Sequence, residues 1–220
     1  MIRAVIFDLD GTLADTISAI REGINLTMQK HGFAEHTDDE VLGFINNGAR
    51  ELVRRAMPKE LQQDEDAVTR VYADYNDFYG MTYHHTKVTY KGIPEVILAL
   101  RKRGLKIAVL SNKQDPYVKK LCQQLLPEGS YDAAQGVILG KPTKPNPYLS
   151  ELVAAQIGVS PSECLMIGDS DVDVKTARMA GMAHIGVSWG YRSSEFLLEN
   201  GAETVVDTPQ MLLETIEKML

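Results

Sequence analysis

The sequence predicts an α/β fold, a doubly wound parallel sheet with an all-helical segment inserted after its first strand. Three observations support this class. A short apolar run from Ile2 to Phe7 is typical of a buried parallel strand. The stretch from there to about His85 has helical periodicity and no convincing strand. From Pro94 onward, expected helices alternate with short apolar strands, which is the pattern of a parallel sheet.

Composition indicates a globular protein with one good core and an insertion or small second domain. The chain has 220 residues, of which 44% are hydrophobic and 24% are charged. The formal net charge of -7 and the lack of a basic stripe argue against a nucleic-acid partner. No apolar run approaches membrane-spanning length and no signal-peptide pattern opens the chain, so we expect a cytoplasmic protein without a membrane partner. Cys122 and Cys164 lie in apolar surroundings and are expected to be reduced.

The first strand ends in two aspartates, Asp8 and Asp10, followed by Gly11. Side chains alternate along a strand, so both carboxylates start on the same side. Two carboxylates at the end of a buried strand repel each other unless a cation lies between them, and an oxygen-only site of this kind suits Mg²⁺. A calcium loop that began at Asp8 would need glycine at its sixth position and glutamate at its twelfth, but the twelfth residue counted from Asp8 is Ala19. A plain Asp-Gly turn remains an alternative.

The segment after this turn is expected to contain helices only. Because it follows the first strand directly, we expect it to lie over the carboxyl end of the sheet, where ligands bind in open α/β folds. The predicted domains are therefore a core of residues 1–14 and 86–220 and a helical cap of residues 15–85. The expected helices run from a cap at Asp15 or Thr16 to about Lys30, from the capping box Thr37–Glu40, from Ala49 to Met57, and to about Tyr83.

The remaining chain gives the alternating pattern of the core. Gly104 is expected at a helix C-cap, and Ser160 to Glu163 form a second capping box. The expected helices are Pro94–Arg103, Tyr117–Leu126, Pro147–Ile157, one ending at Ala180, and a final helix; the expected strands are Leu105–Leu110, a weaker one at Gly136–Leu139, Cys164–Ile167, Ala183–Val187 and a short one at Thr204–Val206.

Polar side chains follow three of the predicted strands, and the carboxyl ends of parallel strands meet at one edge of a sheet. That edge would offer carboxylates for a cation, hydroxyl and amide donors for oxyanions, and one ammonium. These are the parts that a phosphoryl-transfer site needs. The residues are Asp8 and Asp10 after the first strand, Ser111 and Asn112 after the second, Lys144 from a loop, and Asp169 and Asp173 after the fourth strand.

Each of these parts also has a purely structural interpretation. Ser111 and Asn112 could cap the following helix. Lys144 could be a solvated loop lysine, with Lys141 as a rival, although the helix expected behind Lys144-Pro145-Asn146-Pro147 favours Lys144. Asp169 and Asp173 could be turn and helix N-terminal residues, which a helix dipole favours in any case. Because every part follows the right element, we expect one shared site.

Four motifs of the chain, taken in sequence order, resemble those of the haloacid dehalogenase-like hydrolases. The helical segment is similar to the C1 cap of that family, and the resemblance covers essentially the whole chain. Two aspartates in the first motif imply a phosphatase or phosphomutase, because the dehalogenase branch lacks the second one. The motifs are Asp8-Leu9-Asp10-Gly11-Thr12, Ser111-Asn112, Lys144-Pro145-Asn146-Pro147, and Gly168-Asp169-Ser170 with Asp173.

The resemblance implies a role for each core residue. Asp8 is expected to be the nucleophile that forms an aspartyl-phosphate, and Asp10 the general acid and then the base. The implied Mg²⁺ ligands are Asp8, the backbone carbonyl of Asp10, and Asp169; the implied phosphate-binding residues are Ser111, Asn112 and Lys144, with Asp173 orienting these groups.

The residues Asn46-Asn47-Gly48-Ala49-Arg50 resemble the substrate loop of phosphoglycolate phosphatases, although Asn46 stands where that subfamily more often has glycine. Three further stretches also fit the subfamily: Tyr90-Lys91-Gly92, Ser111-Asn112-Lys113 and Gly186 to Tyr191. A small acid needs donors and a cation over the site, which Asn47, Gly48 and Arg50 could supply. Alternatively, Arg50 is a solvated helix residue.

The resemblance therefore implies a Mg²⁺-dependent phosphatase acting on a small phosphorylated acid such as 2-phosphoglycolate, as a monomer or homodimer. A sugar phosphatase, a β-phosphoglucomutase-like enzyme or a pyrophosphatase on the same fold is the alternative. A non-catalytic phosphate-binding module is a third interpretation. The sequence assigns no role to Lys113 or Lys141.

Overall fold

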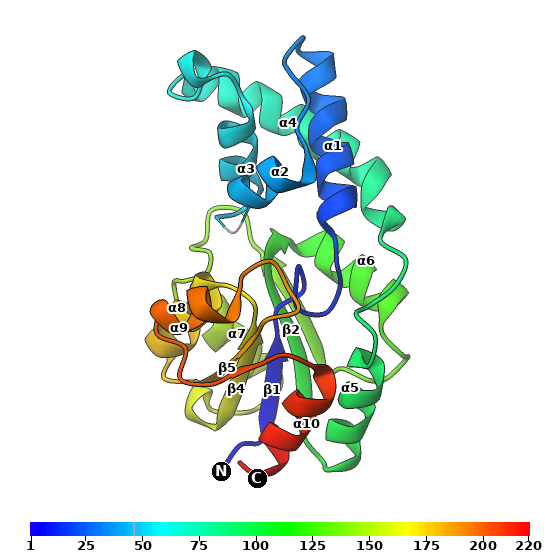
Figure 1. Cartoon of the computed structure of the whole chain (residues 1–220), viewed down its shortest axis with the longest axis vertical. Helices are drawn as coiled ribbons and strands as arrows, with labels where there is room; N and C mark the ends of the chain where they lie inside the picture. Colours follow the sequence, from blue (N-terminus) through cyan, green and yellow to red (C-terminus); the bar gives the residue numbers. More distant parts are fainter. Residues whose placement is uncertain (46) are drawn as a thin grey trace. The chain divides into compact units, whose positions relative to one another are not determined.

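The computed structural model describes residues 1–45 and 47–220, and it confirms the predicted α/β fold class. The chain divides into two compact units (Figure 1). We call Met1–Asp15 with Val88–Leu220 the sheet unit, and Thr16–Lys87 the helical unit. Over residues 1–45 and 47–220, no helix is both long enough and apolar enough to cross a lipid bilayer.

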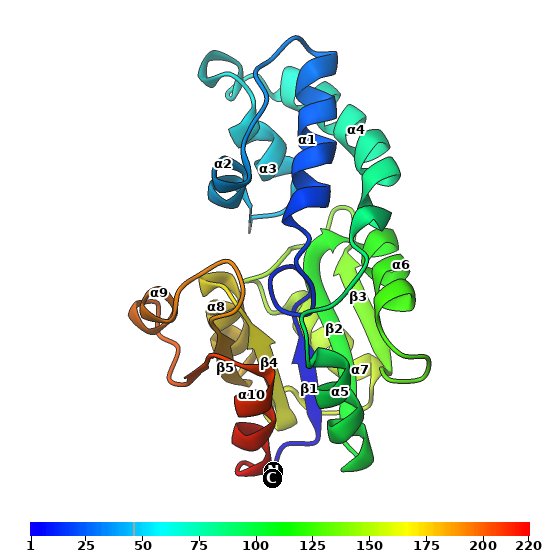
Figure 2. The same ribbon diagram turned by 45° about the vertical axis from the view of Figure 1, so that its right-hand side comes forward.

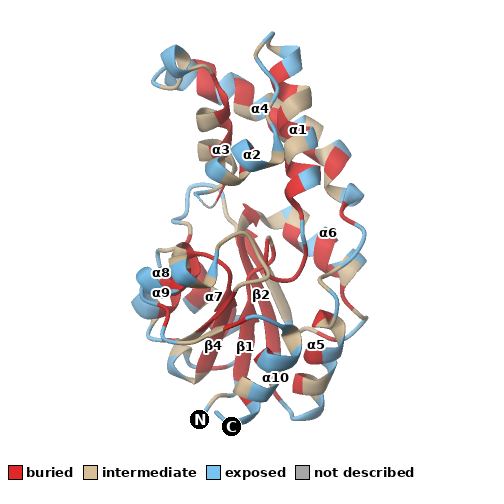
Figure 3. Cartoon of the chain, in the orientation of Figure 1, coloured by how far each residue is buried: buried red, intermediate tan, exposed pale blue. Residues whose placement is uncertain are grey.

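The sheet unit is built on six parallel strands in the order β3-β2-β1-β4-β5-β6. The central strand β1 is buried along its whole length (Figure 3), because helices cover both faces of a parallel sheet and leave no polar side. The carboxyl ends of β1, β2 and β4 are neighbours, as the predicted site requires. The strands are β1 (Ala4–Phe7), β2 (Lys106–Gln114), β3 (Ala133–Val137), β4 (Cys164–Gly168), β5 (Ala183–Val187) and β6 (Val205–Val206).

Helices pack against this sheet from two sides (Figure 2). α7 and α8 share one apolar cluster with β1, β2 and β4, and α5 packs against α10. Both cysteines are free and buried, as predicted. The helices of the sheet unit are α5 (Ile93–Lys102), α6 (Asp115–Leu125), α7 (Tyr148–Gln156), α8 (Asp171–Ala180), α9 (Ser194–Glu199) and α10 (Pro209–Glu217), with a 3-10 turn η3 (Pro161–Glu163).

The described part of the helical unit contains helices and no strand, as the periodicity predicts. The predicted capping box at Thr37 and Glu40 is formed, whereas the Thr16 side chain makes no capping bond to the first helix. The helices α1 (Ile17–Lys30) and α4 (Glu65–Thr82) pack together, with Gly23 of α1 close to Tyr79 of α4. The elements are α1 (Ile17–Lys30), α2 (Asp38–Phe44), α3 (Ala49–Ala56), η1 (Lys59–Leu61), α4 (Glu65–Thr82) and η2 (Tyr83–His85).

Three sequence expectations for the sheet unit are wrong. β2 continues past Leu110 to Gln114, because Gln114 pairs with Val137 beyond an irregularity in the register. The next helix begins at Asp115, two residues before the expected Tyr117, and Ser111 and Asn112 lie in β2 and do not cap it. β3 begins three residues earlier than expected and excludes Leu139, whose side chain is 97% exposed. The short helix α9 has no counterpart among the predicted elements.

Candidate active site

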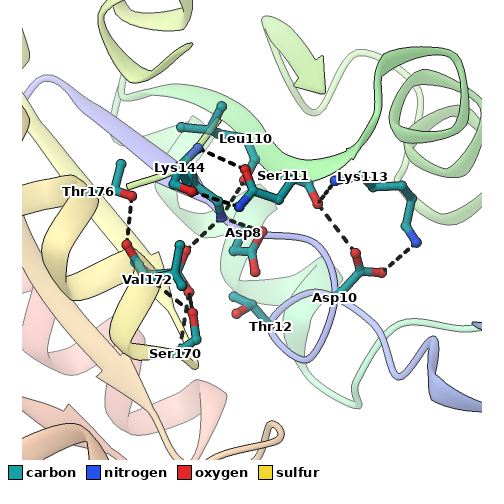
Figure 4. Close-up of polar contacts among 12 residues, drawn as sticks. Asp8, Asp10, Thr12, Leu110, Ser111, Lys113, Lys144, Ser170, Val172 and Thr176 are labelled. Carbon is teal, nitrogen blue, oxygen red and sulfur yellow. Dashed lines mark hydrogen bonds and ion pairs between the residues drawn. The ribbon is translucent and has the colours of Figure 1, made fainter. Parts of the chain in front are cut away.

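The ammonium of Lys144 lies at the centre of a buried polar cluster at the carboxyl edge of the sheet (Figure 4). Its Nζ donates to Asp8 Oδ1 at 2.8 Å, to Asp173 Oδ1 at 2.7 Å and to the Leu110 carbonyl at 3.2 Å. These contacts use all three N–H groups of the ammonium. Lys144 is only 4% exposed, so it is not a solvated loop lysine. The rival Lys141 is exposed.

The Asn112 side chain holds the loop that carries Lys144. Its Oδ1 accepts from the Lys144 backbone N–H at 2.8 Å, and its Nδ2 donates to the Lys144 carbonyl at 3.0 Å. Because one amide satisfies both backbone groups of Lys144, the end of β2 fixes where the lysine side chain begins. A direct bond from Asn112 to phosphate stays a prediction.

Asp10 receives two groups from the end of β2 (Figure 4). Ser111 Oγ donates to Asp10 Oδ2 at 3.4 Å, and Lys113 Nζ lies 3.1 Å from Asp10 Oδ1. The Ser111 hydroxyl also accepts from the Lys113 backbone N–H at 3.1 Å. The longer β2 therefore carries two partners of Asp10.

Asp173 is fixed by the start of α8. Ser170 is the N-cap residue, and its backbone N–H and hydroxyl donate to Asp173 Oδ2 at 3.2 and 2.6 Å. This reciprocal pattern satisfies donors that the first turn of a helix leaves open, and a carboxylate here is favoured by the helix dipole. Asp173 is fully buried, with its other oxygen on Lys144.

Asp169 leaves β4 and is enclosed by glycines. Its Oδ2 accepts from the Tyr191 backbone N–H at 2.7 Å, and its Oδ1 accepts from Thr12 Oγ1 at 3.4 Å. A Cβ on Gly11 would stand 2.7 Å from Asp169 Cγ, and one on Gly190 would stand 2.5 Å from Asp169 Cβ. Gly11 also has φ +80°, a conformation that glycine adopts without strain. The backbone can approach Asp169 this closely only because both residues are glycines.

Burial and mutual repulsion act on the carboxylates of this cluster. Burial, together with Asp173 and Asp10, raises the pKa of Asp8 to about 7 against the opposing effect of Lys144. Burial, Asp8 and Asp173 raise the pKa of Asp169 well above its usual range. The pKa of Lys144 is raised because Asp173 and Asp8 outweigh the effect of its burial. The cluster is thus short of positive charge.

The donor set fits a hard divalent cation. Asp8, Asp169 and Asp173 each offer a carboxylate oxygen, and these oxygens lie within 4.8 Å of one another. Counted with Asp10, the cluster holds two more carboxylates than the ammonium groups of Lys144 and Lys113 neutralise. Asp8 and Asp173 pair with the Lys144 ammonium, whereas the Thr12 hydroxyl and the Tyr191 N–H that contact Asp169 are neutral, so Asp169 is the carboxylate best suited to a cation.

The residues predicted for substrate specificity belong to the helical unit. Arg50 Nη2 donates to Glu65 Oε2 at 2.9 Å and to Thr69 Oγ1 at 3.0 Å. Turned so that its amide oxygen faces Arg55, Asn47 accepts from that guanidinium at 3.2 and 2.8 Å. Gly48 is the N-cap of α3 with φ +82°. Asn46, which begins the resemblance to the substrate loop, lies outside the described residues.

Several residues of the cluster were not among the predicted site residues: Lys113, Ser170, Thr12, Gly190 and Tyr191. Ser170 could have been found, because a serine three residues before an acidic residue is a capping-box signal. Lys113 could have been found only if the strand had been expected to continue. Tyr191 acts through its backbone N–H, which carries no signal in the sequence.

The fold and this cluster define an α/β protein with a carboxylate-rich site at the end of its central strand. The family model described as haloacid dehalogenase-like hydrolase matches residues 5–187, so the chain belongs to this family. The expected class of enzyme, a phosphoric monoester hydrolase, is confirmed.

Individual relatives cover nearly the whole chain. It is 29% identical to a phosphoglycolate phosphatase of Vibrio vulnificus, over 98% of this chain and 96% of that protein. It is also 29% identical to a phosphoglycolate phosphatase of Pseudomonas putida, over 96% of this chain and 78% of that protein. A solved structure from Lactobacillus delbrueckii, assigned as a phosphoglycolate phosphatase, is 32% identical with a TM-score of 0.88 and covers 97% of this chain and 98% of its own.

Proposed function

We propose that this phosphatase is Mg²⁺-dependent and hydrolyses a small phosphorylated acid, 2-phosphoglycolate in particular, through an aspartyl-phosphate on Asp8. The observation that carries the chemistry is the pairing of Asp8 with the buried Lys144 ammonium at 2.8 Å, beside a carboxylate set short of positive charge. The likeness to phosphoglycolate phosphatases of Vibrio vulnificus and Pseudomonas putida supports the choice of substrate.

In the first step an Asp8 oxygen attacks phosphorus and forms a P–O bond, while the bond from phosphorus to the ester oxygen breaks. The electron pair of the broken bond stays on the ester oxygen, which takes a proton from Asp10. In the second step Asp10 removes a proton from water as that water attacks phosphorus. The bond to Asp8 breaks, so the Asp8 carboxylate and inorganic phosphate are released.

The other residues hold charge and position in both steps. Lys144, fixed by Asn112 and Asp173, would offset negative charge on the phosphoryl oxygens. Ser111 would donate to one of those oxygens. Bound Mg²⁺, held by Asp8, the Asp10 carbonyl and Asp169, would supply further neutralisation of the transferring phosphoryl group.

We further propose that the helical unit is a C1-type cap and that Asn47, Gly48 and Arg50 contact substrate from it. The resemblance of this loop to the substrate loop of phosphoglycolate phosphatases supports the proposal. Arg50 would then share its guanidinium between the substrate and its partners Glu65 and Thr69.

The test is phosphate release from 2-phosphoglycolate, hexose phosphates, pyrophosphate and nucleoside monophosphates, each with Mg²⁺ and with EDTA. We expect turnover that needs Mg²⁺ and is strongest on phosphoglycolate. Stronger turnover of another phosphoester would overturn the choice of 2-phosphoglycolate as substrate, but not the proposed hydrolysis through an aspartyl-phosphate. Equal turnover with Mg²⁺ and with EDTA would overturn the proposed dependence on Mg²⁺. No turnover of any ester, with phosphate exchange between two sugar positions, would indicate a mutase.

A further inference from the structure

The site contains a second buried lysine to which neither the sequence motifs nor the proposed steps give a role. The Lys113 side chain is only 6% exposed, and its ammonium lies 3.1 Å from Asp10 Oδ1. It is there because β2 continues through Ser111, Asn112 and Lys113. Residues two apart in a strand face the same side, so Ser111 and Lys113 both point at Asp10 (Figure 4).

The two lysines of the site pair with different carboxylates. Lys144 has its three N–H groups on Asp8, Asp173 and the Leu110 carbonyl, and burial fixes it beside the nucleophile. Lys113 pairs instead with Asp10, the residue expected to protonate the ester oxygen of the leaving group. Figure 4 shows Lys144 beside Asp8 and Lys113 beside Asp10, so the cations serve different ends of the reacting bond.

A small phosphorylated acid carries its carboxylate close to the ester oxygen. In phosphoglycolate one methylene separates the two groups, so a cation that touches the acid catalyst at this oxygen is within reach of the carboxylate. An ammonium binds a carboxylate by charge-assisted hydrogen bonds, and such bonds are strongest where water is excluded. Asp10 keeps the ammonium poorly exposed and aimed at this position.

Building on the proposed function, we propose that Lys113 binds the carboxylate of the substrate and selects acids over neutral phosphoesters. Arg50 of the helical unit, the residue expected from the sequence, already has Glu65 and Thr69 as partners. Lys113 instead lies in the sheet unit beside the expected acid catalyst, and an ammonium can share its donors between Asp10 and a substrate carboxylate.

The experiment compares kcat/KM for 2-phosphoglycolate with kcat/KM for ethyl phosphate, which has the same chain length and no carboxylate. The variants are Lys113→Met, Lys113→Arg and Arg50→Ala. Lys141→Met is the matched control, because Lys141 is exposed and lies over the Tyr148 ring. Fluorescence of Trp189, the only tryptophan of the chain, reports whether each variant is folded.

We expect Lys113→Met to lower the preference for the acid at least tenfold through KM, Lys113→Arg to retain part of it, and Lys141→Met to leave it unchanged. Equal losses on both substrates would overturn the inference, because Lys113 would then serve Asp10 alone. The inference would also be overturned if the preference for phosphoglycolate over ethyl phosphate fell in Arg50→Ala and not in Lys113→Met. A wild-type enzyme with no preference for the acid would overturn the proposed substrate itself.

Discussion

Replacing Asp169 with asparagine should have opposite effects on stability without and with a divalent cation. Asp169 is 2% exposed, and burial, Asp8 and Asp173 raise its pKa. Asparagine keeps the shape and can still accept from the Tyr191 N–H, but it removes one of the repelling charges. The metal-free variant should therefore be more stable than the wild type at pH 8, where the unfolded chain has lost the proton that the raised pKa of Asp169 favours in the folded state.

With a divalent cation bound, the wild type should be more stable than the Asp169→Asn variant. A ligand present at a hundredfold excess over its Kd stabilises the folded state by about 2.7 kcal/mol. In a chain of this length that is a rise in Tm of roughly 5–10 °C. Since Asp169 is the carboxylate best suited to hold the cation, Asp169→Asn should lose most of this rise while the wild type shows it.

Thermal unfolding followed by Trp189 fluorescence is the assay, because this tryptophan donates to the Thr12 carbonyl inside the sheet unit. Asp171→Asn is the matched control: Asp171 lies two residues away, pairs with Lys175 at 2.5 Å, and is not part of the buried cluster. A metal-free Asp169→Asn protein that is less stable than the wild type, or one that Mg²⁺ stabilises as much, would refute the reasoning.

Three further outcomes are expected. Asp8→Asn should lower kcat by roughly a thousandfold or more while Trp189 fluorescence stays native, and substantial residual turnover would contradict the nucleophile assignment. In EDTA the free energy of unfolding should fall as pH rises from about 4 to about 7. The reason is that Asp8, whose pKa is raised to about 7 in the folded protein, keeps a proton that the unfolded chain has lost. Chemical denaturation across this pH range measures the effect, and a free energy of unfolding that rises with pH would contradict the prediction. Gly190→Ala should lower both Tm and metal affinity, because its Cβ would stand 2.5 Å from Asp169 Cβ and against the Gly11 carbonyl; calorimetric Mg²⁺ titration equal to that of wild type would contradict it.

The sequence predicts the elements whose signal is local. β1, β4 and β5 are short apolar runs bounded by polar or turn residues, and they are observed within two residues of the expected ends. Two capping boxes, at Thr37 and Ser160, are formed as expected, since each depends on residues three positions apart. The site residues at the strand ends came from the same local signal.

The end of β2 shows what the sequence could not give. The residues from Ser111 to Gln114 are polar, and nothing local favours a strand there. The strand continues because Gln114 pairs with Val137 of β3, and Asp115 then accepts from the Gly136 N–H at 3.0 Å. Those contacts join segments more than twenty residues apart, so neither the length of β2 nor the position of Lys113 follows from periodicity.

The cluster also explains why one part of this chain departs from the rules that the rest follows. Apolar strands, capped helices and glycine turns all favour the same fold, whereas a buried set of mutually repelling carboxylates opposes it. A chain selected for stability alone would replace Asp8 or Asp169 with an amide at little steric cost. The proposed chemistry accounts for their presence beside two buried lysines, because it would need an ionised nucleophile whose charge cations neutralise only in part.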